Sequence, residues 1–294
     1  MSGSAEKESL VYRRFTSDDI AAAHGLSMAV SWPHRAEDWR FGFEAGSGFI
    51  AEEAGVVIGT ALFWKFGADR ATLGMVIVSP EHQGRGIGGK LMNLILEETG
   101  NRVTFLHATK AGQPLYEKLG FRAHGSLDQH QGAVFQAPLV SLPAGERLRP
   151  LGVNDTPQLI ELASRAAGLD RSDALPALMQ NADGIALDRD GELLGFALFR
   201  RFGRGYSIGP VVAADTPDLS RAKALIRHWL ALNEGAFVRI DMPTGSGLTE
   251  WLVELGLPRV DTVVKMVRNS DPARHVGPPD TLFRQYGIIN QAMM

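Results

Sequence analysis

The chain has 294 residues, about twice the ~150 of a typical domain, so its length predicts two domains. Its 45% apolar and 21% charged residues exclude disordered, collagen-like and coiled-coil classes, and the absence of cysteine excludes disulfides and thiolate metal sites. The net charge of -3 leaves no cation surplus for nucleic-acid binding. We see no bilayer-length apolar run and no secretion signal, so we expect a cytoplasmic protein with neither a membrane nor a nucleic-acid partner.

The first half of the chain alternates strand and helix patterns. Short apolar runs between turn residues predict strands, and apolar residues spaced i, i+4, i+7 and i+8 from Ile87 predict a helix. Ser17 or Asp18 is the expected N-cap of the first helix. In chain order, the expected elements are strand 11–15, helix 17–28, strands 48–52, 56–64 and 71–78, the helix from Ile87, strand 103–108, helix 113–119 and strand 133–137. This order indicates a mixed α/β fold.

The second half of the chain repeats the first. Residues 58–67 (IGTALFWKFG) resemble residues 194–203 (LGFALFRRFG) at an offset of 136 positions, and Arg13 falls on Arg149 at the same offset. Separated segments that share one offset indicate two copies of one domain. The expected parts are a first domain at 1–140, a second at 146–270, and a C-terminal tail at 271–294 that packs back on one of them.

The segment between strand 71–78 and the following helix is rich in glycine. Four glycines between Gly84 and Gly89 leave backbone N–H groups free to converge on an anion at the helix N-terminus, which is more than a plain turn needs. The spacing fits a P-loop, but Leu91 stands where that motif has a hydroxyl for magnesium. It also fits a dinucleotide-binding loop, but no acid follows at the end of strand 103–108. The segment therefore lacks the hydroxyl that a P-loop needs and the acid that a dinucleotide-binding loop needs.

A third interpretation rests on two motifs. The segment Gln83-Gly84-Arg85-Gly86-Ile87-Gly88 follows a strand that ends in Val78-Ser79-Pro80, and Tyr116 precedes Leu119-Gly120-Phe121. In both motifs the chain resembles the GCN5-related N-acetyltransferase (GNAT) superfamily, strongly in the first copy and as a weaker echo in the second. The resemblance implies an α/β (mixed α+β) fold of two tandem GNAT-like domains, each with a mostly antiparallel central sheet flanked by helices. It also implies direct transfer of an acetyl group from acetyl-CoA to an amine within a ternary complex.

The resemblance further implies the roles of individual residues. The glycine loop would bind the pyrophosphate of coenzyme A, the strand before it would pair with the pantetheine, and the Val78 N–H would donate to the developing oxyanion. Tyr116 would be the general acid, and His107 is the nearest candidate for a general base or water relay, because strand 71–78 carries no carboxylate. Thr109 stands where the family often has Asn. The implied coenzyme-binding residues are Val76, Ile77, Val78, Gln83, Gly84, Arg85, Gly86, Ile87, Gly88, Gly89 and Thr109, and no metal site is expected.

Several residues also fit structural roles. Tyr116 fits a core aromatic, and His107 fits a hydrogen-bonded strand residue. The cluster 34–39 (HRAEDW) would either grip a charged acceptor or form an ordinary helix face. In the second copy, the offset of 136 places residues 83–88 on 219–224, where every glycine is replaced, and places Leu252 at the tyrosine position. We therefore expect that the second copy has lost coenzyme binding and supports the first, as the partner subunit of a dimer would.

The favoured function is an acetyl-CoA-dependent N-acetyltransferase that acts on a small-molecule amine, as a monomer or weak dimer. An amine of a protein is the second enzymatic option. A non-catalytic acyl-CoA sensor is the alternative from another class, and the missing carboxylate base and the degenerate repeat favour it. A nucleotide-binding enzyme that uses the incomplete P-loop ranks below these.

Overall fold

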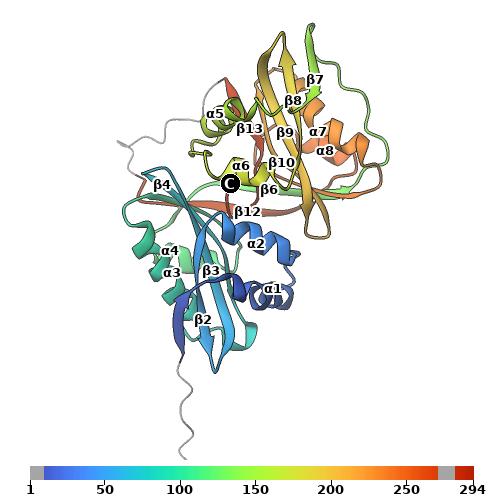
Figure 1. The fold of residues 1–294 in the computed structure, drawn as a ribbon. Helices are drawn as coiled ribbons and strands as arrows, with labels where there is room; N and C mark the ends of the chain where they lie inside the picture. Colours follow the sequence, from blue (N-terminus) through green and yellow to red (C-terminus); the bar gives the residue numbers. More distant parts are fainter. Residues whose placement is uncertain (1–9, 271–281) are drawn as a thin grey trace, which may run out of the picture. The chain divides into compact units, whose positions relative to one another are not determined.

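The computed structural model describes residues 10–270 and 282–294 (Figure 1). It divides into two compact units, Met1–Lys65 with Leu73–Gly100, and Phe66–Thr72 with Asn101–Met294. The units do not follow the two sequence copies, because residues 101–140 of the first copy belong to the second unit. The domain boundaries drawn from the repeat therefore remain a prediction. Within the described ranges, each helix is too short or too polar to traverse a bilayer.

The first unit contains antiparallel strands and three helices. β1 pairs with β2, Val11 opposite Glu52, and β2 pairs with β3, Ser47 opposite Phe63. Its elements, with β3 and β4 partly in the second unit, are β1 (Val11–Arg14), the 3-10 turn η1 (Ser17–Asp19), α1 (Ile20–Ala29), α2 (Ala36–Glu44), β2 (Ser47–Glu53), β3 (Val56–Phe66), β4 (Arg70–Val78), the 3-10 turn η2 (Pro80–His82) and α3 (Ile87–Thr99). The predicted strands of this region and the helix from Ile87 are confirmed.

The first helix begins differently from the prediction. The N-cap is neither Ser17 nor Asp18: Thr16 caps the 3-10 turn η1, and Asp19 is the N-cap of α1. The Thr16 N–H donates to the Asp19 carboxylate at 2.8 Å, and the Thr16 hydroxyl donates to it at 3.0 Å. Such a capping box satisfies polar groups at a helix start. Arg13 adds two hydrogen bonds of 2.8 Å to the same carboxylate. The chain therefore makes a short 3-10 turn before α1 begins.

The predicted apolar stripe of α3 faces the interior. Ile87, Leu91 and Ile95 are each no more than 1% exposed, and a fully buried aliphatic side chain stabilises a fold by about 1.5–3 kcal/mol. Gly59 on β3 allows the helix to come close, because a Cβ at that position would lie 3.2 Å from Leu91 Cδ1 and 3.3 Å from the Ile77 carbonyl oxygen. This packing holds the first turn of α3, and with it the glycine loop.

The second unit is a larger, mostly antiparallel sheet with helices. Its strands run in the order β5-β12-β6-β11-β10-β9-β8-β7, and β13 pairs with β10. In chain order its elements are β5 (Val103–Ala108), α4 (Gln113–Lys118), β6 (Arg122–Ala133), β7 (Glu146–Pro150), α5 (Thr156–Ala167), α6 (Ala174–Met179), β8 (Asp183–Arg189), β9 (Glu192–Phe202), β10 (Gly205–Ala214), α7 (Ser220–Leu232), β11 (Phe237–Pro243), α8 (Thr249–Glu254), β12 (Arg259–Arg268) and β13 (Phe283–Gly287). The repeat is visible in contacts as well as in order, since Arg149 donates to Asp155 at 2.7 and 2.9 Å as Arg13 does to Asp19.

Strands of the two sequence copies alternate in this sheet. β12 of the second copy lies between β5 and β6 of the first, and β6 in turn lies between β12 and β11. In the register, Met266 of β12 lies opposite Leu106 of β5, and Val263 of β12 lies opposite Leu127 of β6. All four side chains are buried. Each copy therefore completes the sheet of the other.

The strand expected at 133–137 is wrong. The strand is β6, which runs from Arg122 to Ala133, and residues 134–137 are irregular. Its sequence, RAHGSLDQHQGA, has little β-branched or alternating apolar character, and it becomes a strand because β12 and β11 supply hydrogen-bond partners on both edges. Pairing between the copies thus overrides the local preference.

The C-terminal segment contributes to the core of the second unit. β13 pairs antiparallel with β10, and Met293 and Met294 are buried. Residues 271–281 of the expected tail lie outside the described residues. The rest of that tail packs on the second unit, around a core that includes Leu225, Ile226 and Trp229 of α7.

Candidate functional site

The glycine loop places exposed backbone amides at the start of α3. Gly84 and Gly86 both have a φ of +78°, and Gly86 is the N-cap of the helix. Side chains at these positions would meet no neighbour within 4 Å but would strain the backbone, which for L-residues costs roughly 1–2 kcal/mol. The first intrahelical bond runs from the Lys90 N–H to the Gly86 carbonyl at 3.1 Å, so the preceding amides of the helix have no acceptor within it. These features fit a phosphate or diphosphate.

Side chains of the loop are held by the strands beside it. The Gln83 side-chain amide donates to the Val78 carbonyl at 3.1 Å. Arg85 makes two hydrogen bonds, of 2.9 and 2.6 Å, to the carboxylate of Glu53, and this contact lowers the pKa of Glu53. His82 Nε2 lies 3.6 Å from the same carboxylate. The charge of Arg85 is thus balanced by an acid that the sequence analysis missed, and nothing in the sequence around Glu53 pointed to it.

The end of β4 presents only part of the predicted pantetheine surface. Val76 and Val78 are partly exposed, whereas Ile77 is 3% exposed and packs inward. Before them, Met75 has a φ of +53°, uncommon for a residue other than glycine, and its carbonyl accepts a hydrogen bond of 3.0 Å from the Thr60 hydroxyl. Ile77 can therefore offer a ligand its backbone but not its side chain.

In the second unit, Tyr116 lies on α4 and is 9% exposed. Its ring packs edge-on against Phe121, with 6.1 Å between centroids, and Gly112 leaves room for it, since a Cβ there would lie 3.2 Å from Tyr116 Cε2. Among the described residues the hydroxyl has no hydrogen-bond partner. Burial raises the pKa of Tyr116 to about 12, so the phenol holds its proton more tightly than an ordinary tyrosine.

His107 lies on β5, and its Nδ1 is 2.6 Å from the Gln291 carbonyl oxygen. Because a carbonyl only accepts hydrogen bonds, Nδ1 carries the proton and Nε2 keeps its lone pair. Burial and the nearby charge of Lys265 lower the pKa of His107 to about 4. The imidazole is therefore neutral at pH 7 and is a weak base there.

Thr109 and the cluster 34–39 serve the local fold. The Thr109 carbonyl accepts from the Gly112 and Gln113 N–H groups at 3.0 Å each, which starts α4. Asp38 accepts from the backbone N–H of Arg35 at 2.9 Å and from its guanidinium at 3.0 Å, which caps α2. Trp39 is fully buried. These contacts favour the helix-face interpretation of the cluster, and the coenzyme contact expected for Thr109 stays a prediction.

Comparison with known proteins identifies the family. Residues 44–123 and 159–277 each match a family model described as an acetyltransferase (GNAT) domain. Over 225 residues, the chain is 32% identical to YitH of Bacillus subtilis (strain 168), described as an uncharacterized N-acetyltransferase, and the match covers 75% of each protein. The chain belongs to the GNAT N-acetyltransferase family.

Solved structures share the tandem GNAT fold. The crystal structure of a Pyrococcus horikoshii protein matches with a TM-score of 0.75 at 22% identity, over 100% of this chain and 98% of its own. A tandem GNAT protein from the clavulanic acid biosynthesis pathway matches with a TM-score of 0.65 at 16% identity, over 90% of this chain and 99% of its own. At these identities the likeness concerns the fold, and it confirms the predicted tandem GNAT architecture.

The second GNAT copy has a different loop at the corresponding place. Its helix α7 starts at Ser220, which is 133 positions after Ile87, so the offset of 136 does not hold here and the loop is three residues shorter. The N-cap is Leu219 with a φ of +59° instead of Gly86, and the Ser220 N–H donates to the Asp218 carboxylate at 3.1 Å. An acid already occupies the helix start, and it would repel a phosphate.

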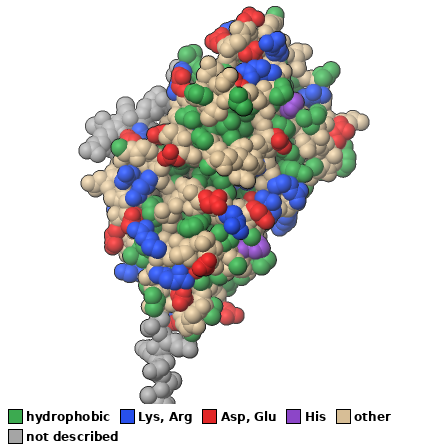
Figure 2. Space-filling view, viewed as in Figure 1, with side chains coloured by type: hydrophobic (Ala, Val, Ile, Leu, Met, Phe, Trp, Pro, Cys, Tyr) green, Lys and Arg blue, Asp and Glu red, His purple; other side chains and the backbone are tan. Residues whose placement is uncertain are grey.

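The face of the molecule shown in Figure 2 carries charges of both signs. On the face seen in Figure 2, Lys and Arg side chains lie interspersed with Asp and Glu. Within residues 10–270 and 282–294, no group of three or more His, Asp or Glu side chains is placed to hold a metal ion. The glycine loop thus stands out by its backbone geometry rather than by charge.

Proposed function

We propose that the first GNAT copy transfers the acetyl group of acetyl-CoA to an amine of a small molecule. The observation that carries this proposal is the pair of left-handed glycines, Gly84 and Gly86, that opens amides at the start of α3. The second copy supports it by contrast, because Leu219 stands in place of Gly86 and the Asp218 carboxylate already accepts from the Ser220 N–H.

The proposed roles follow from the chemistry of each group. Gly84 through Gly89 bind the pyrophosphate through backbone N–H groups, and Val76 and Val78 contact the pantetheine. When bound, acetyl-CoA supplies a thioester carbonyl, to which the amine nitrogen forms a bond while the carbon–sulfur bond breaks. The Val78 N–H donates to the carbonyl oxygen as negative charge develops there. The proton of the amine passes to water, with His107 Nε2 as a relay, and the sulfur leaves as a thiolate that takes up a proton from water.

Tyr116 acts on the leaving sulfur mainly as a hydrogen-bond donor. Burial raises the pKa of Tyr116 to about 12, above the ~8.5 of an ordinary thiol, so complete proton transfer from the phenol to the sulfur is unfavourable. A hydrogen bond to the sulfur avoids this cost. The burial of Tyr116 thus favours a hydrogen-bond donor that stabilises the thiolate over the predicted general acid.

Two matched glycine substitutions, one at each end of α3, test whether the glycine loop binds the coenzyme. Gly86→Ala and Gly100→Ala replace left-handed glycines that have open space around them and cap opposite ends of the helix. We expect acetyl-CoA to raise the melting temperatures of the wild type and of Gly100→Ala, because a ligand that binds only the native state stabilises it. We expect a much smaller rise for Gly86→Ala. Equal stabilisation of all three proteins would remove the loop from coenzyme binding.

A non-catalytic acyl-CoA sensor is the second candidate. The lowered pKa of His107 and the raised pKa of Tyr116 favour it, because both groups are poorly matched to proton transfer at neutral pH. Release of free coenzyme A, measured over a panel of small amines and lysine peptides, separates the two. Saturable acetyl-CoA binding without release on any acceptor would support the sensor.

A further inference from the structure

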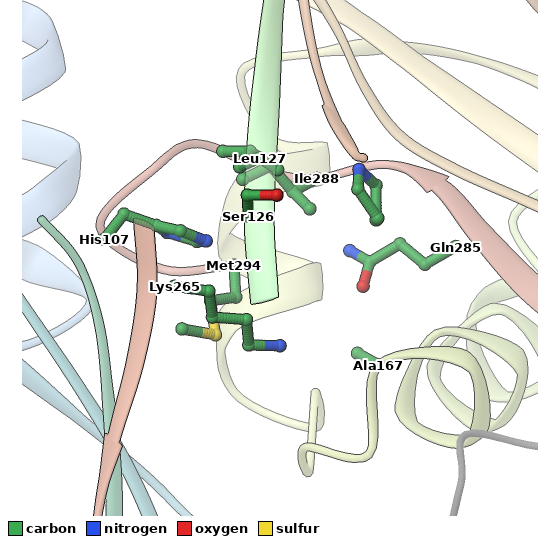
Figure 3. Close-up of a pocket in the computed structure, with 9 residues that line it drawn as sticks. His107, Ser126, Leu127, Ala167, Lys265, Gln285, Ile288 and Met294 are labelled. Carbon is green, nitrogen blue, oxygen red and sulfur yellow. The ribbon is translucent and has the colours of Figure 1, made fainter. Parts of the chain in front are cut away.

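A small cavity of about 60 Å³ lies within the second unit. It is lined by β5, β6 and β12, by the C-terminal end of β11, by β13 and by the last residue described, Met294. The side chains of His107, Lys265 and Gln285 border one open space in Figure 3. By the same measure a water needs roughly 10–15 Å³, so the cavity has room for about five non-hydrogen atoms.

The strand register brings two of these side chains together. His107 of β5 lies directly opposite Lys265 of β12 in the antiparallel ladder. Residues directly opposite each other in such a ladder point to the same face of the sheet, with Cβ atoms about 4.5–5.5 Å apart. A residue from each GNAT copy therefore faces the same cavity.

Lys265 has an amine without a polar partner. Its Nζ lies 5.2 Å from the centroid of the Phe105 ring, and it makes neither a hydrogen bond nor an ion pair with any residue in the described part of the chain. Burial and the charge of Arg171 lower the pKa of Lys265. A partly buried amine of this kind destabilises a fold unless something pairs with it. A carboxylate in the cavity would provide that pair.

His107 supplies the complementary group. Its Nδ1–H donates to the Gln291 carbonyl, so Nε2 remains as the acceptor of a side chain that lines the cavity. An acceptor on one side and an amine on the other match a molecule that carries an N–H and a carboxylate. Gln285, on β13, adds an amide that can serve either end.

We propose that this cavity binds a small amino acid, with its carboxylate on Lys265 and its amine directed to His107 Nε2. L-alanine, with six non-hydrogen atoms, is close to the available volume. Use of the bound amino acid as the acetyl acceptor rests on the proposed function, whereas its binding does not. The proposal would narrow the acceptor class from small amines to amino acids.

Calorimetric titration of the full chain with three probes tests the binding. L-alanine has both groups, propionate lacks the amine, and ethylamine lacks the carboxylate. We expect L-alanine to bind most tightly and Lys265→Met to weaken L-alanine and propionate by about 10- to 100-fold, since a hydrogen bond to a charged group is lost. Lys118→Met, which removes an exposed lysine of α4, should change neither. A folded Lys265→Met protein that binds L-alanine as the wild type does would overturn the proposal.

Two further readouts separate this site from the proposed function. Lys265→Met should melt at the same temperature as the wild type or higher, because it removes a poorly solvated amine, and acetyl-CoA should still stabilise it. Tight binding of L-alanine without coenzyme A release would keep the site and reject amino acids as acceptors. Coenzyme A release on other amines, with no binding of L-alanine or propionate, would keep the transferase and reject the site.

Discussion

Removing the second copy should unfold the sheet region of the first. A chain ending at residue 140 keeps β5 and β6 but loses β12, which lies between them, and β11, which lies beside β6. Three buried side chains of β5 and β6, namely Phe105, Leu106 and Leu127, lie opposite buried residues of β12 and would lose them. Exposing each of these side chains costs about 1.5–3 kcal/mol, so the free energy of unfolding falls by roughly 5–9 kcal/mol. That equals much of the 5–15 kcal/mol by which a typical domain is stable.

The assay compares the urea unfolding of residues 1–140 with that of the full chain, both monitored by circular dichroism. We expect the fragment to show no cooperative transition, and co-expression with residues 141–294 to restore one, because the strands can interleave again. Two point variants of the full chain give a matched test. Met266→Ala should lower the free energy of unfolding by about 2–5 kcal/mol, whereas Val260→Ala, at an exposed position of the same strand, should lower it far less. A fragment of residues 1–140 that unfolds cooperatively with the stability of the full chain would refute this reasoning.

Three further predictions concern single groups. Tyr116→Phe should lower the rate of coenzyme A release by about 10- to 100-fold with little change in acetyl-CoA affinity, because a hydrogen bond to the leaving sulfur is lost. Glu53→Gln should tighten acetyl-CoA binding by about twofold to fivefold in calorimetry, since it frees Arg85 and exposed ion pairs are weak. The lowered pKa of His107 means that protonation is disfavoured in the folded state, so stability is full above about pH 6.5 and falls by at most about 3 kcal/mol as the pH drops towards 4. Urea unfolding at several pH values measures this loss, and His107→Gln should abolish it.

Each of these predictions has a result that contradicts it. A loss of 1000-fold or more in Tyr116→Phe would indicate complete proton transfer, which the raised pKa argues against. Weaker acetyl-CoA binding in Glu53→Gln, with no change in the neighbouring Glu52→Gln, would mean that Glu53 positions Arg85 rather than competing for it. An acid-induced loss of the same size in His107→Gln would assign the pH dependence to other groups.

The sequence alone determined the tandem GNAT architecture and the place of the glycine loop. Both are readable because they depend on local requirements: left-handed backbone at Gly84 and Gly86, and an apolar stripe along α3. Short-range rules of this kind depend on consecutive residues, which is why the strands of residues 10–119 and the helices α1, α3 and α4 were predicted within a few positions. The helix α2 (Ala36–Glu44) was not among the expected elements.

The tertiary structure alone decided which groups pair across the chain. The strand at Arg122–Ala133 forms because β11 and β12 accept it, and Arg85 is balanced by Glu53 from a distant hairpin. Lys265 is one of four charged residues of β12, and only the register shows that it lies opposite His107. The pKa values of Tyr116 and His107 likewise depend on burial by residues far away in sequence. Desolvation and cross-strand pairing are long-range effects, and no local pattern encodes them.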